Sequence, residues 1–400
     1  MIATLAFVLA LALAQTREEK SPSAERPPEV GASEITGAIR KGVVLLVAGQ
    51  ENYSESGTQP SKGASAPVRE WPYEGVYRVD GEIPIGYRVG GTAICATALL
   101  ESRGEALPPS VAESIDRGLA FVLEGIRDPK MSPSFEGGYD TRGWGHAYAL
   151  GFLLRLRELE RVPGAEKARV DEAIRWLVAA LEKTEIHSRG GWNYARGKDP
   201  DAAAPSTFMT APTLQFLFEA ARLGEKVDAE VVGRALDALE SGRLESGAFQ
   251  YGIDPAHRTG KGFEAVEGAI GRSPICETTL YLAGRGSLER IRAALDAFFA
   301  NWEWLEKRRK QTGTHVAPFM IAPYYFFYAH RYAAQAIELL AAEDRPGYRQ
   351  KLYALLWKVR EEDGGWNDRV FPRSETFGTA MSMLALLSPK LPAPARWPRK

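Results

Sequence analysis

The chain has 400 residues, of which 45% are hydrophobic and 25% charged, with a formal net charge of −1. This balance lacks the basic surplus of nucleic-acid-binding proteins, so we expect no nucleic-acid partner. After the N-terminal segment, no apolar run approaches the roughly 18 residues that cross a membrane, so no membrane span is expected in the mature chain.

The first fourteen residues, MIATLAFVLALALA, form a short apolar run that ends in Ala12-Leu13-Ala14. Such a run with a small-residue ending is typical of a secretory signal peptide, although the usual leading lysine or arginine is missing. We expect residues 1–14 to be removed after Ala14 and the protein to be secreted or periplasmic; an uncleaved anchor is the alternative. Residues 15–33 are polar and proline-rich and are expected to be a tether.

Two kinds of helix are expected to alternate after residue 33. In SLERIRAALDAFFANWEWLEKRRKQ, Leu288, Ile291 and Leu295 follow at steps of three and four, which places them on one face. Helices with one charged face are expected at 34–48, 110–125, 166–183, 228–241, 287–309 and 346–361. Helices with an almost uncharged middle, which indicates burial on all sides, are expected at 88–102, 142–158, 208–222, 274–284, 323–341 and 376–388.

Several helix ends carry capping signals. Ser110 has Glu113 three residues later, which predicts a capping box. Asp228 is expected to cap the helix that ends at Gly242. Ser273 is expected to be the N-cap of the helix that contains Cys276.

Repetition roughly every 50 to 66 residues is the signature of a closed or stacked array. We therefore predict an all-α fold, an (α/α)6 toroid of six helical hairpins over residues 34–390, with a tail at 391–400. The uncharged helices would form its inner ring and the amphipathic helices its outer ring. Glycines before Trp192 and Trp366 are expected to allow a tight turn between the rings, where each aromatic side chain fills a gap between hairpins.

Three pairs of segments carry a resemblance to a known superfamily. They are EEDGGWND with SETFGTAMSMLALL, RGGWNYA with STFMTAPTLQFLFEA, and APYYFFYAHRYAAQAIELL followed by YRQKLYALLWKVR. These segments resemble the terpenoid cyclase and protein prenyltransferase superfamily of α/α toroids, in particular bacterial proteins with prenyltransferase and squalene-oxidase repeats. The resemblance spans about residues 34–390 and implies a deep apolar cavity for isoprenoids inside the inner ring. It predicts the fold better than the reaction, because function belongs to sites.

One polar residue recurs near the start of each uncharged helix, and we expect these residues to crown the central cavity: Thr92, His146, Thr210, Cys276, Tyr328 and Thr379. Trp144, Glu277 and Tyr325 are also expected to line it. Cys276 falls in the first turn of its helix, where the helix dipole favours a thiolate.

The resemblance implies one metal site to consider. Protein prenyltransferases bind zinc with a cysteine at the start of an inner helix and a histidine on a following one, which correspond here to Cys276 and His330. Pro274 stands where those enzymes have an aspartate ligand, although zinc normally needs three or four protein ligands. The alternative is that Cys276 is a small buried residue. An isoprenoid-processing enzyme would use His146, Cys276 and His330 as catalytic residues.

Two other enzyme chemistries have weaker support. Terpene cyclases that protonate their substrate use a D-x-D-D motif, whereas GKDPDAAAP supplies only Asp199 and Asp201. A polysaccharide-processing (α/α)6 barrel would need a pair of carboxylates in an aromatic-lined cleft. Its candidate acids are Asp140, Glu277, Asp368 and Glu375, and its candidate stacking residues are Trp144, Trp192, Tyr194, Tyr251 and Trp366.

The absence of a diagnostic motif favours a protein that binds an apolar, isoprenoid-like ligand or a protein partner in its central cavity, with no reaction assigned. The alternatives are an isoprenoid-processing enzyme and a polysaccharide-processing barrel. Cys95 and Cys276 would stand on opposite sides of the ring, too far apart for a disulfide. The long connection at 50–86 is expected to fold over one face of the ring, anchored by Trp71, Tyr73 and Tyr77.

Overall fold

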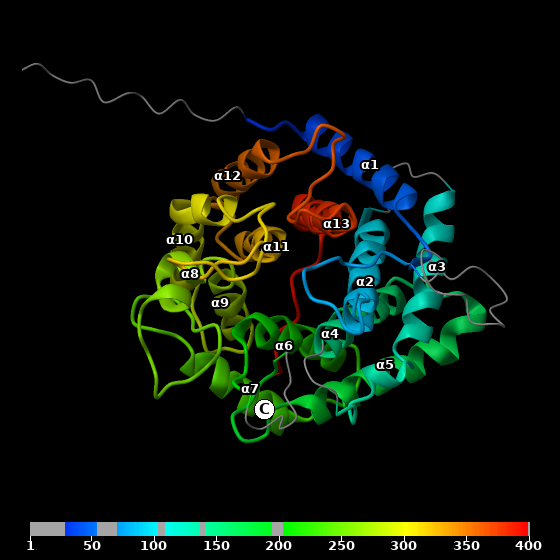
Figure 1. Cartoon of the computed structure of the whole chain (residues 1–400), viewed down its shortest axis with the longest axis horizontal. Helices are drawn as coiled ribbons and strands as arrows, with labels where there is room; N and C mark the ends of the chain where they lie inside the picture. Colours follow the sequence, from blue (N-terminus) through cyan, green and yellow to red (C-terminus); the bar gives the residue numbers. More distant parts are fainter. Residues whose placement is uncertain (1–28, 54–69, 103–108, 137–140, 194–202, 399–400) are drawn as a thin grey trace, which may run out of the picture.

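The computed structural model describes residues 29–53, 70–102, 109–136, 141–193 and 203–398. Its long helices form two concentric rings, which Figure 1 shows from above. The segment expected to be a signal peptide lies outside the described residues. Within them there are isolated β-bridges but no strand, so the expected all-α toroid is confirmed.

The inner ring consists of six largely buried helices. They are α2 (Ile85–Glu101), α4 (Arg142–Glu158), α6 (Thr207–Arg222), α9 (Ser273–Leu282), α11 (Tyr325–Ile337) and α13 (Ser374–Leu387). Each packs on the next in this order, and α13 packs back on α2, so the ring is closed. Closure explains why these helices are apolar all round, since each one is covered by two inner neighbours and by the outer layer.

The outer ring consists of six amphipathic helices. They are α1 (Ala32–Ala48), α3 (Ser110–Gly125), α5 (Lys167–Thr184), α7 (Ala229–Ser241), α10 (Leu288–Glu306) and α12 (Arg345–Lys358). A short helix, α8 (Val266–Ala269), lies in the connection between α7 and α9. On α10 the expected stripe faces inward, because Ile291, Leu295 and Phe298 are all buried. The charged face of each outer helix meets water.

The helix ends agree with the sequence in part. Asp228 caps α7 by accepting a hydrogen bond from the Glu230 amide at 2.8 Å, and Gly242 follows the helix end, as predicted. The capping box at Ser110 was a wrong prediction, because Pro109 occupies the N-cap position of α3 and no side chain caps it. Similarly, Arg272 rather than Ser273 is the N-cap residue of α9.

A buried tryptophan joins the outer and inner rings at three places. The backbone amides of Trp71, Trp192 and Trp366 each donate to a threonine hydroxyl on the following inner helix at 3.0 Å. The indole N–H groups donate to carbonyls near the ends of the preceding outer helices, at 2.7 Å, 2.8 Å and 2.9 Å respectively. We call these residues the tryptophan wedges.

The glycines before two of these wedges have the conformations that the sequence indicated. Gly190, Gly191 and Gly364 have φ values of 78°, 80° and 92°, which favour glycine. A Cβ atom on Gly191 would also lie 2.7 Å from the Thr210 hydroxyl. The GGW motif is therefore a joint between the rings.

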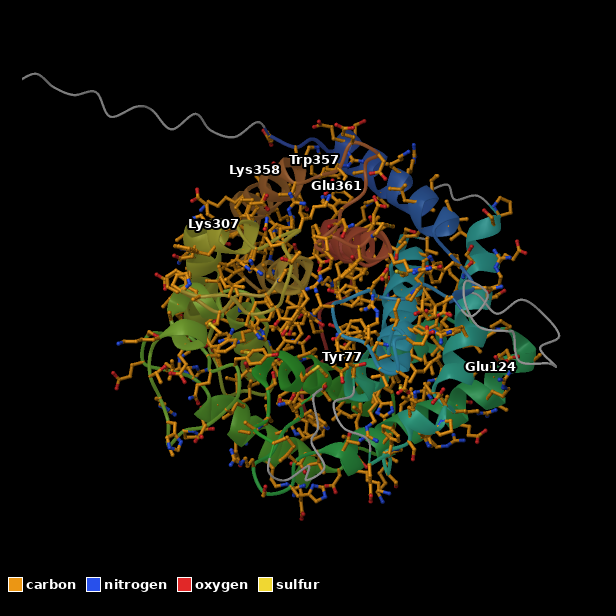
Figure 2. All side chains as sticks on the ribbon, viewed as in Figure 1. Tyr77, Glu124, Lys307, Trp357, Lys358 and Glu361 are labelled. Atoms are coloured by element: carbon orange, nitrogen blue, oxygen red, sulfur yellow. The ribbon has the colours of Figure 1, made fainter. Side chains whose placement is uncertain are left out.

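Two segments cross the two ends of the ring. The described part of the long connection, residues 70–84, crosses the end where the inner helices start; there Tyr73 packs on Phe377 of α13 at a ring-centroid distance of 4.3 Å. Figure 2 shows Tyr77 over the middle of the ring, whereas Lys307 and Glu124 lie near its edge. The C-terminal segment, residues 388–398, runs from α13 across the opposite end towards α6 and α9 (Figure 1).

Candidate functional site

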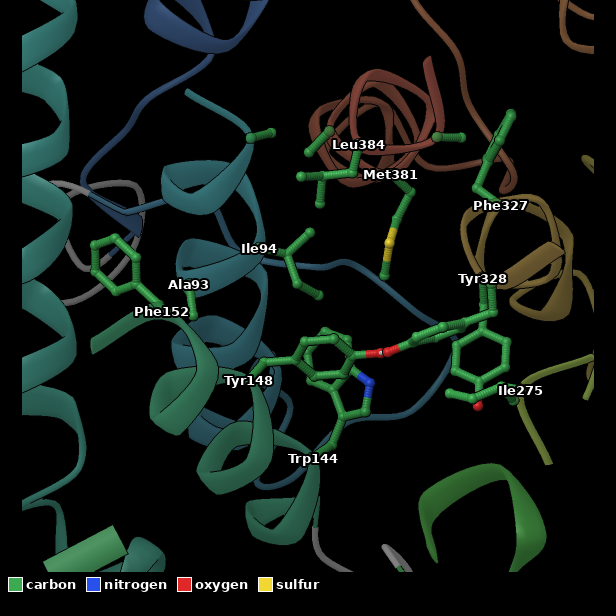
Figure 3. Packing of buried hydrophobic residues seen from close by; sticks show 14 of the residues in the cluster. Ala93, Ile94, Trp144, Tyr148, Phe152, Ile275, Phe327, Tyr328, Met381 and Leu384 are labelled. Atoms are coloured by element: carbon green, nitrogen blue, oxygen red, sulfur yellow. Dashed lines mark hydrogen bonds between the residues drawn. The ribbon is translucent and has the colours of Figure 1, made fainter. Parts of the chain in front are cut away.

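Side chains fill the middle of the inner ring. The hydroxyl groups of Tyr148 on α4 and Tyr332 on α11 meet at 3.0 Å. Figure 3 shows Tyr148 and Trp144 pointing into the middle of the ring. Trp144 packs on Tyr148 and on Tyr73, at centroid distances of 5.1 Å and 5.8 Å. Tyr328 stacks on Phe208 of α6 at 3.9 Å. This aromatic layer separates the two ends of the ring, and each end has its own cavity.

The first cavity lies at the C-terminal ends of the inner helices and has a volume of about 390 Å³. We call it the tail-covered cavity, because residues 388–394 form part of its wall. Its apolar lining comes from four inner helices and the C-terminal segment: Ile94, Phe152, Phe216, Met381, Leu384 and Leu391. The hydroxyl-bearing rings of Tyr148 and Tyr332 also line it.

The C-terminal segment is held over this cavity by specific contacts. The Ala395 amide donates to Glu219 at 2.8 Å, and the Trp397 amide donates to the Leu282 carbonyl at 3.2 Å. The Trp397 ring packs on Phe218 at 5.4 Å. Ordinary tail residues fray, whereas these contacts make the segment a built part of the cavity wall.

Charged residues surround the apolar part of the tail-covered cavity. Arg155 bonds to Glu158 at 2.6 Å and pairs with Glu101, and Arg222 pairs with Glu158 and Glu219. These pairs lie where the inner helices end, a place where cations also interact favourably with the helix dipoles. The cavity therefore combines an apolar interior with a rim of paired charges.

The second cavity lies at the N-terminal ends of the inner helices, also with a volume of about 390 Å³. We call it the aromatic bowl, after the tyrosines that line it: Tyr73, Tyr77, Tyr87, Tyr251 and Tyr324. The hydroxyls of Tyr251 and Tyr324 meet at 2.9 Å, and His315 Nε2 lies 3.1 Å from the Tyr324 hydroxyl. Burial, with Arg272 nearby, lowers the pKa of His315 to about 4, so this imidazole is neutral at pH 7.

Asp368 lies behind the aromatic bowl and is fully buried. Its Oδ2 accepts a hydrogen bond from the Tyr73 hydroxyl at 3.2 Å, whereas its Oδ1 has no partner. Burial raises the pKa of Asp368 to about 7, even though Arg369 favours the charged form. A carboxyl group that titrates near neutral pH beside a cavity is a candidate proton donor or acceptor.

Three of the six polar residues that were expected around the central cavity instead form hydrogen bonds with the tryptophan wedges. The hydroxyls of Thr92, Thr210 and Thr379 accept the amide hydrogens of Trp71, Trp192 and Trp366. They are buried and line neither cavity. Because the wedges lie between the rings, these threonines lie on the side of each inner helix that faces the outer ring, not on the side that faces the ring axis.

The two histidines expected to be catalytic also face the outer layer. His146 Nε2 lies 2.9 Å from the Met131 carbonyl, and its ring packs edge-on against Trp176 of α5. His330 Nε2 accepts a hydrogen bond from the Trp302 indole at 2.8 Å, so its Nδ1 carries the proton and donates to the Phe326 carbonyl at 2.7 Å. Burial lowers the pKa of both imidazoles to about 4.

The thiolate expected at Cys276 does not form, because burial raises the pKa of this thiol far above its usual range. Its Sγ lies 3.9 Å from the Thr207 carbonyl on α6. Cys95 on α2 and Cys276 on α9 are both free and buried. The structure does not bring His146, Cys276 and His330 together.

The zinc ligand set that the resemblance implied does not fit the structure. Both ring nitrogens of His330 have partners in the protein, and Pro274 cannot ligate. In the part of the chain that the structure describes, no group of three or more His, Cys, Asp or Glu side chains could hold a metal ion.

The remaining predicted site residues are divided among different places. Tyr325, Tyr328 and Trp144 belong to the aromatic layer, and the Tyr325 hydroxyl lies 3.2 Å from His315. Glu277 forms a two-bond ion pair with Arg243 of the α7–α9 connection, at 2.8 Å and 2.7 Å, away from both cavities. Asp140, Tyr194, Asp199 and Asp201 lie outside the described residues.

The structure also changes the set of residues available for sugar stacking. Trp192 and Trp366 are buried wedges, so they cannot meet a sugar ring. Tyr251 does line the aromatic bowl, as does His315, which the sequence did not single out. Arg331 of the tail-covered cavity was also missed. It interrupts the otherwise uncharged stretch YYFFYAHRYAAQAI, and that lone arginine was the signal that could have found it.

Comparisons with known proteins add the fold class. No protein-family model matches the chain, and no curated protein sequence matches it. Among solved structures, the type II terpene cyclase MstE from Scytonema matches with a TM-score of 0.52, over 91% of this chain and 100% of that one, at 15% identity. An inactive variant of an α-1,6-mannanase from a Salegentibacter species, in complex with α-1,6-mannotetrose, matches with a TM-score of 0.54.

The mannanase match covers 88% of this chain and 98% of the mannanase, at 12% identity. The protein therefore has the α/α-toroid fold that terpene cyclases and some glycosidases share, and the expected likeness to the terpenoid cyclase and prenyltransferase superfamily is confirmed as a likeness of fold. Identities this low show the fold alone. Among the described residues no helix is long and apolar enough to cross a membrane.

Proposed function

We propose that the protein binds a small apolar, isoprenoid-like molecule in the tail-covered cavity. The observation that carries this proposal is a largely apolar cavity of about 390 Å³ beneath the C-terminal segment, separated from the aromatic bowl by the aromatic layer. This volume lies in the range of small-molecule sites, which are concave and mostly apolar with a few polar groups. The sequence left a protein partner open as the occupant, but a covered cavity of this size favours a small molecule.

Calorimetric titration with farnesol tests this function. We expect farnesol to bind the wild-type protein and to raise its melting temperature. Thr97 lines the cavity on α2, and Thr97→Phe would fill part of the space and weaken farnesol binding roughly tenfold or more. Thr312→Phe, at an exposed loop position, is the control and should bind like wild type. If farnesol does not bind the wild-type protein, the proposal fails.

An isoprenoid-processing enzyme remains the catalytic version of the same proposal. It would need groups other than His146, Cys276 and His330, because these three side chains bond to neighbouring helices instead of lining the cavity. Incubation with farnesyl diphosphate followed by mass spectrometry of the products separates the two versions. Conversion of farnesyl diphosphate would show that the protein is an enzyme. That activity should be retained in Cys276→Ala.

Carbohydrate binding at the aromatic bowl is a second candidate function. The combination of Tyr251, His315 and the neighbouring Asp368 favours it, since aromatic faces and convergent polar groups suit sugar rings. The match to a mannanase concerns the fold only. Saturation-transfer NMR with α-1,6-mannotetrose, together with a reducing-sugar assay, tests it; no transfer and no released sugar would rule out that glycan as ligand and substrate.

We also propose that the protein is exported, with cleavage after Ala14, a site outside the described residues. N-terminal sequencing of the mature protein from the cell envelope and the medium tests this localisation. A mature chain that begins at Gln15 supports it, whereas a chain that keeps residues 1–14 indicates an uncleaved anchor.

A further inference from the structure

Arg331 places a guanidinium without a direct ion-pair partner in the wall of the tail-covered cavity. It lies on α11, is half-buried, and lines the cavity. Its guanidinium donates to the Ser388 hydroxyl at 3.1 Å and lies 6.0 Å from the centre of the Tyr332 ring. Among the described residues it forms no ion pair. Burial lowers the pKa of Arg331, which means that its surroundings disfavour the cation.

The other arginines near this cavity show how unusual Arg331 is. Arg155 and Arg222 are both paired with glutamates. Arg345 shares the lack of an ion pair within the described chain, but its Nε donates to the Leu340 carbonyl in the connection between α11 and α12. Glu338, the remaining carboxylate of the wall, is held by Arg349 of α12. Each carboxylate of this wall therefore contacts another arginine, and none of them forms an ion pair with Arg331.

A second unsatisfied group lies beside Arg331. Gln335 follows four residues later, so both side chains are on the same face of α11, and both line the cavity. Its Oε1 atom is buried and has no hydrogen-bond partner. A guanidinium without an ion pair in the wall of an apolar cavity indicates a place for an anionic group. The Gln335 oxygen is an acceptor, so an ionised carboxylate would pair with Arg331 and not with this oxygen.

We propose that the molecule bound in this cavity is an apolar monocarboxylic acid, whose carboxylate pairs with the Arg331 guanidinium beneath the C-terminal segment. This inference rests on the proposed function, to which it adds the head group. A guanidinium binds a carboxylate through two parallel hydrogen bonds, and burial strengthens such a pair. The apolar body would lie against Ile94, Met381 and Leu384.

The charges around the cavity favour one negative charge over two. Glu101, Glu158 and Glu219 all line the wall, and together they carry one more negative charge than Arg155 and Arg222 carry positive charge. Glu101 also acts on Arg331 from a distance. These carboxylates would repel a doubly charged phosphate more strongly than a singly charged carboxylate, which is enough to form an ion pair with Arg331.

Three ligands with the same apolar body test the head group by calorimetric titration at pH 7.5: farnesol, farnesoate and farnesyl phosphate. We expect farnesoate to bind wild type roughly tenfold or more tightly than farnesol, since hydrogen bonds to charged groups are the stronger ones. Farnesyl phosphate should bind more weakly than farnesoate. Arg331→Gln should lose the preference for farnesoate and bind farnesol as the wild type does.

Two further variants separate a ligand-binding role from a structural one. Arg331→Lys keeps the charge but loses the planar guanidinium, so it should retain part of the preference for farnesoate. It also tests the role of the charge in the case that Arg331→Gln does not fold. Arg292→Gln removes an arginine of the outer surface that pairs with Asp344, and it should leave the preference unchanged. Without ligand, Arg331→Gln should melt at the wild-type temperature or above, because an unpaired half-buried cation does not stabilise the fold.

Each outcome decides between the two proposals. Equal affinities for farnesoate and farnesol would overturn the carboxylate inference and leave the proposed function standing. Tighter binding of farnesyl phosphate than of farnesoate would also overturn it, in favour of a phosphate head group. Binding of none of the three would overturn both proposals. A preference for farnesoate that persists in Arg331→Gln would show that another group, such as Arg345, holds the acid, and would overturn the assignment to Arg331.

Discussion

The hydroxyl groups of Tyr148 and Tyr332 meet at 3.0 Å inside the inner ring, from helices α4 and α11 that are not neighbours in the ring. Both residues are almost completely buried. Their contact, together with the rings of Trp144 and Tyr328, forms a layer that separates the two ends of the toroid. The tail-covered cavity and the aromatic bowl are separate for this reason.

The tyrosine pair should stabilise the ring as a unit. Tyr148→Phe leaves the Tyr332 hydroxyl buried without its partner, which should lower the free energy of unfolding by about 1–3 kcal/mol. The double variant Tyr148→Phe, Tyr332→Phe removes both hydroxyls and should be closer to wild type than the single variant. Urea unfolding of the four proteins gives the coupling energy. Additive effects of the two changes would contradict a direct bond.

The tryptophan wedges depend on their threonine partners. Thr379→Val keeps the shape of the side chain but leaves the buried Trp366 amide without an acceptor, so it should cost about 1–3 kcal/mol in unfolding free energy. Thr210→Val should behave in the same way at Trp192. Thr312→Val, at an exposed site, is the control and should stay within about 0.5 kcal/mol of wild type. Equal stabilities of all three variants would refute the role of the hydroxyls.

Asp368 should make stability depend on pH. Its pKa is about 7 in the folded protein and about 3.9 when unfolded, so between these values the folded state binds more protons. Its contribution to stability is therefore favourable at low pH and is lost as pH rises from about 4 to about 7. Asp368→Asn should remove this component. The stability of the variant relative to that of the wild type should therefore be higher at pH 8 than at pH 4.

Thermal unfolding of wild type and Asp368→Asn across this pH range measures the effect. The difference between the two proteins matters, because His146 and His330 contribute a slope of opposite sign below pH 6.5. Asp237→Asn, at an exposed position on α7, is the control and should follow the wild-type profile. A wild-type profile that coincides with that of Asp368→Asn would show that Asp368 does not titrate in this range.

The two thiols should be unreactive in the native protein. Burial raises the pKa of Cys95 and Cys276, and both side chains are fully enclosed. A thiol reagent such as Ellman's reagent should modify neither cysteine at pH 8 in native protein and both in urea. Cys95→Ala and Cys276→Ala assign any signal to one residue. Rapid modification of Cys276 in the native protein would support the thiolate that the sequence predicted.

Much of the fold could be predicted from local sequence patterns. The expected uncharged helix at 142–158 and charged-face helix at 228–241 differ from α4 and α7 by at most a residue at either end. The spacing and polarity of the residues within one segment indicate whether it forms a helix and how much of that helix is buried. Each helix could therefore be predicted from its own segment. The GGW joint could also be predicted, because Gly190, Gly191 and Gly364 adopt φ values that other residues rarely take.

The site could not be predicted in the same way. Alignment of the inner helices placed Thr92, Thr210 and Thr379 on the cavity, but an inner helix is apolar all round and its composition does not say which side faces the axis. The resemblance to protein prenyltransferases made His330 a candidate zinc ligand, although its Nε2 accepts a hydrogen bond from Trp302 of the outer ring. Trp71 has no double glycine before it, so its role as a third wedge was hidden.

The sequence by itself therefore determined the helices, their alternation and the closed double ring, because periodicity and glycine conformation are local properties of the chain. Only the tertiary structure decided which side chains meet across the ring. The pairing of Tyr148 with Tyr332 and the exposure of Arg331 to a cavity beneath residues 388–394 depend on the rotation of each helix about its axis. That rotation is set by packing against neighbours far away in the sequence.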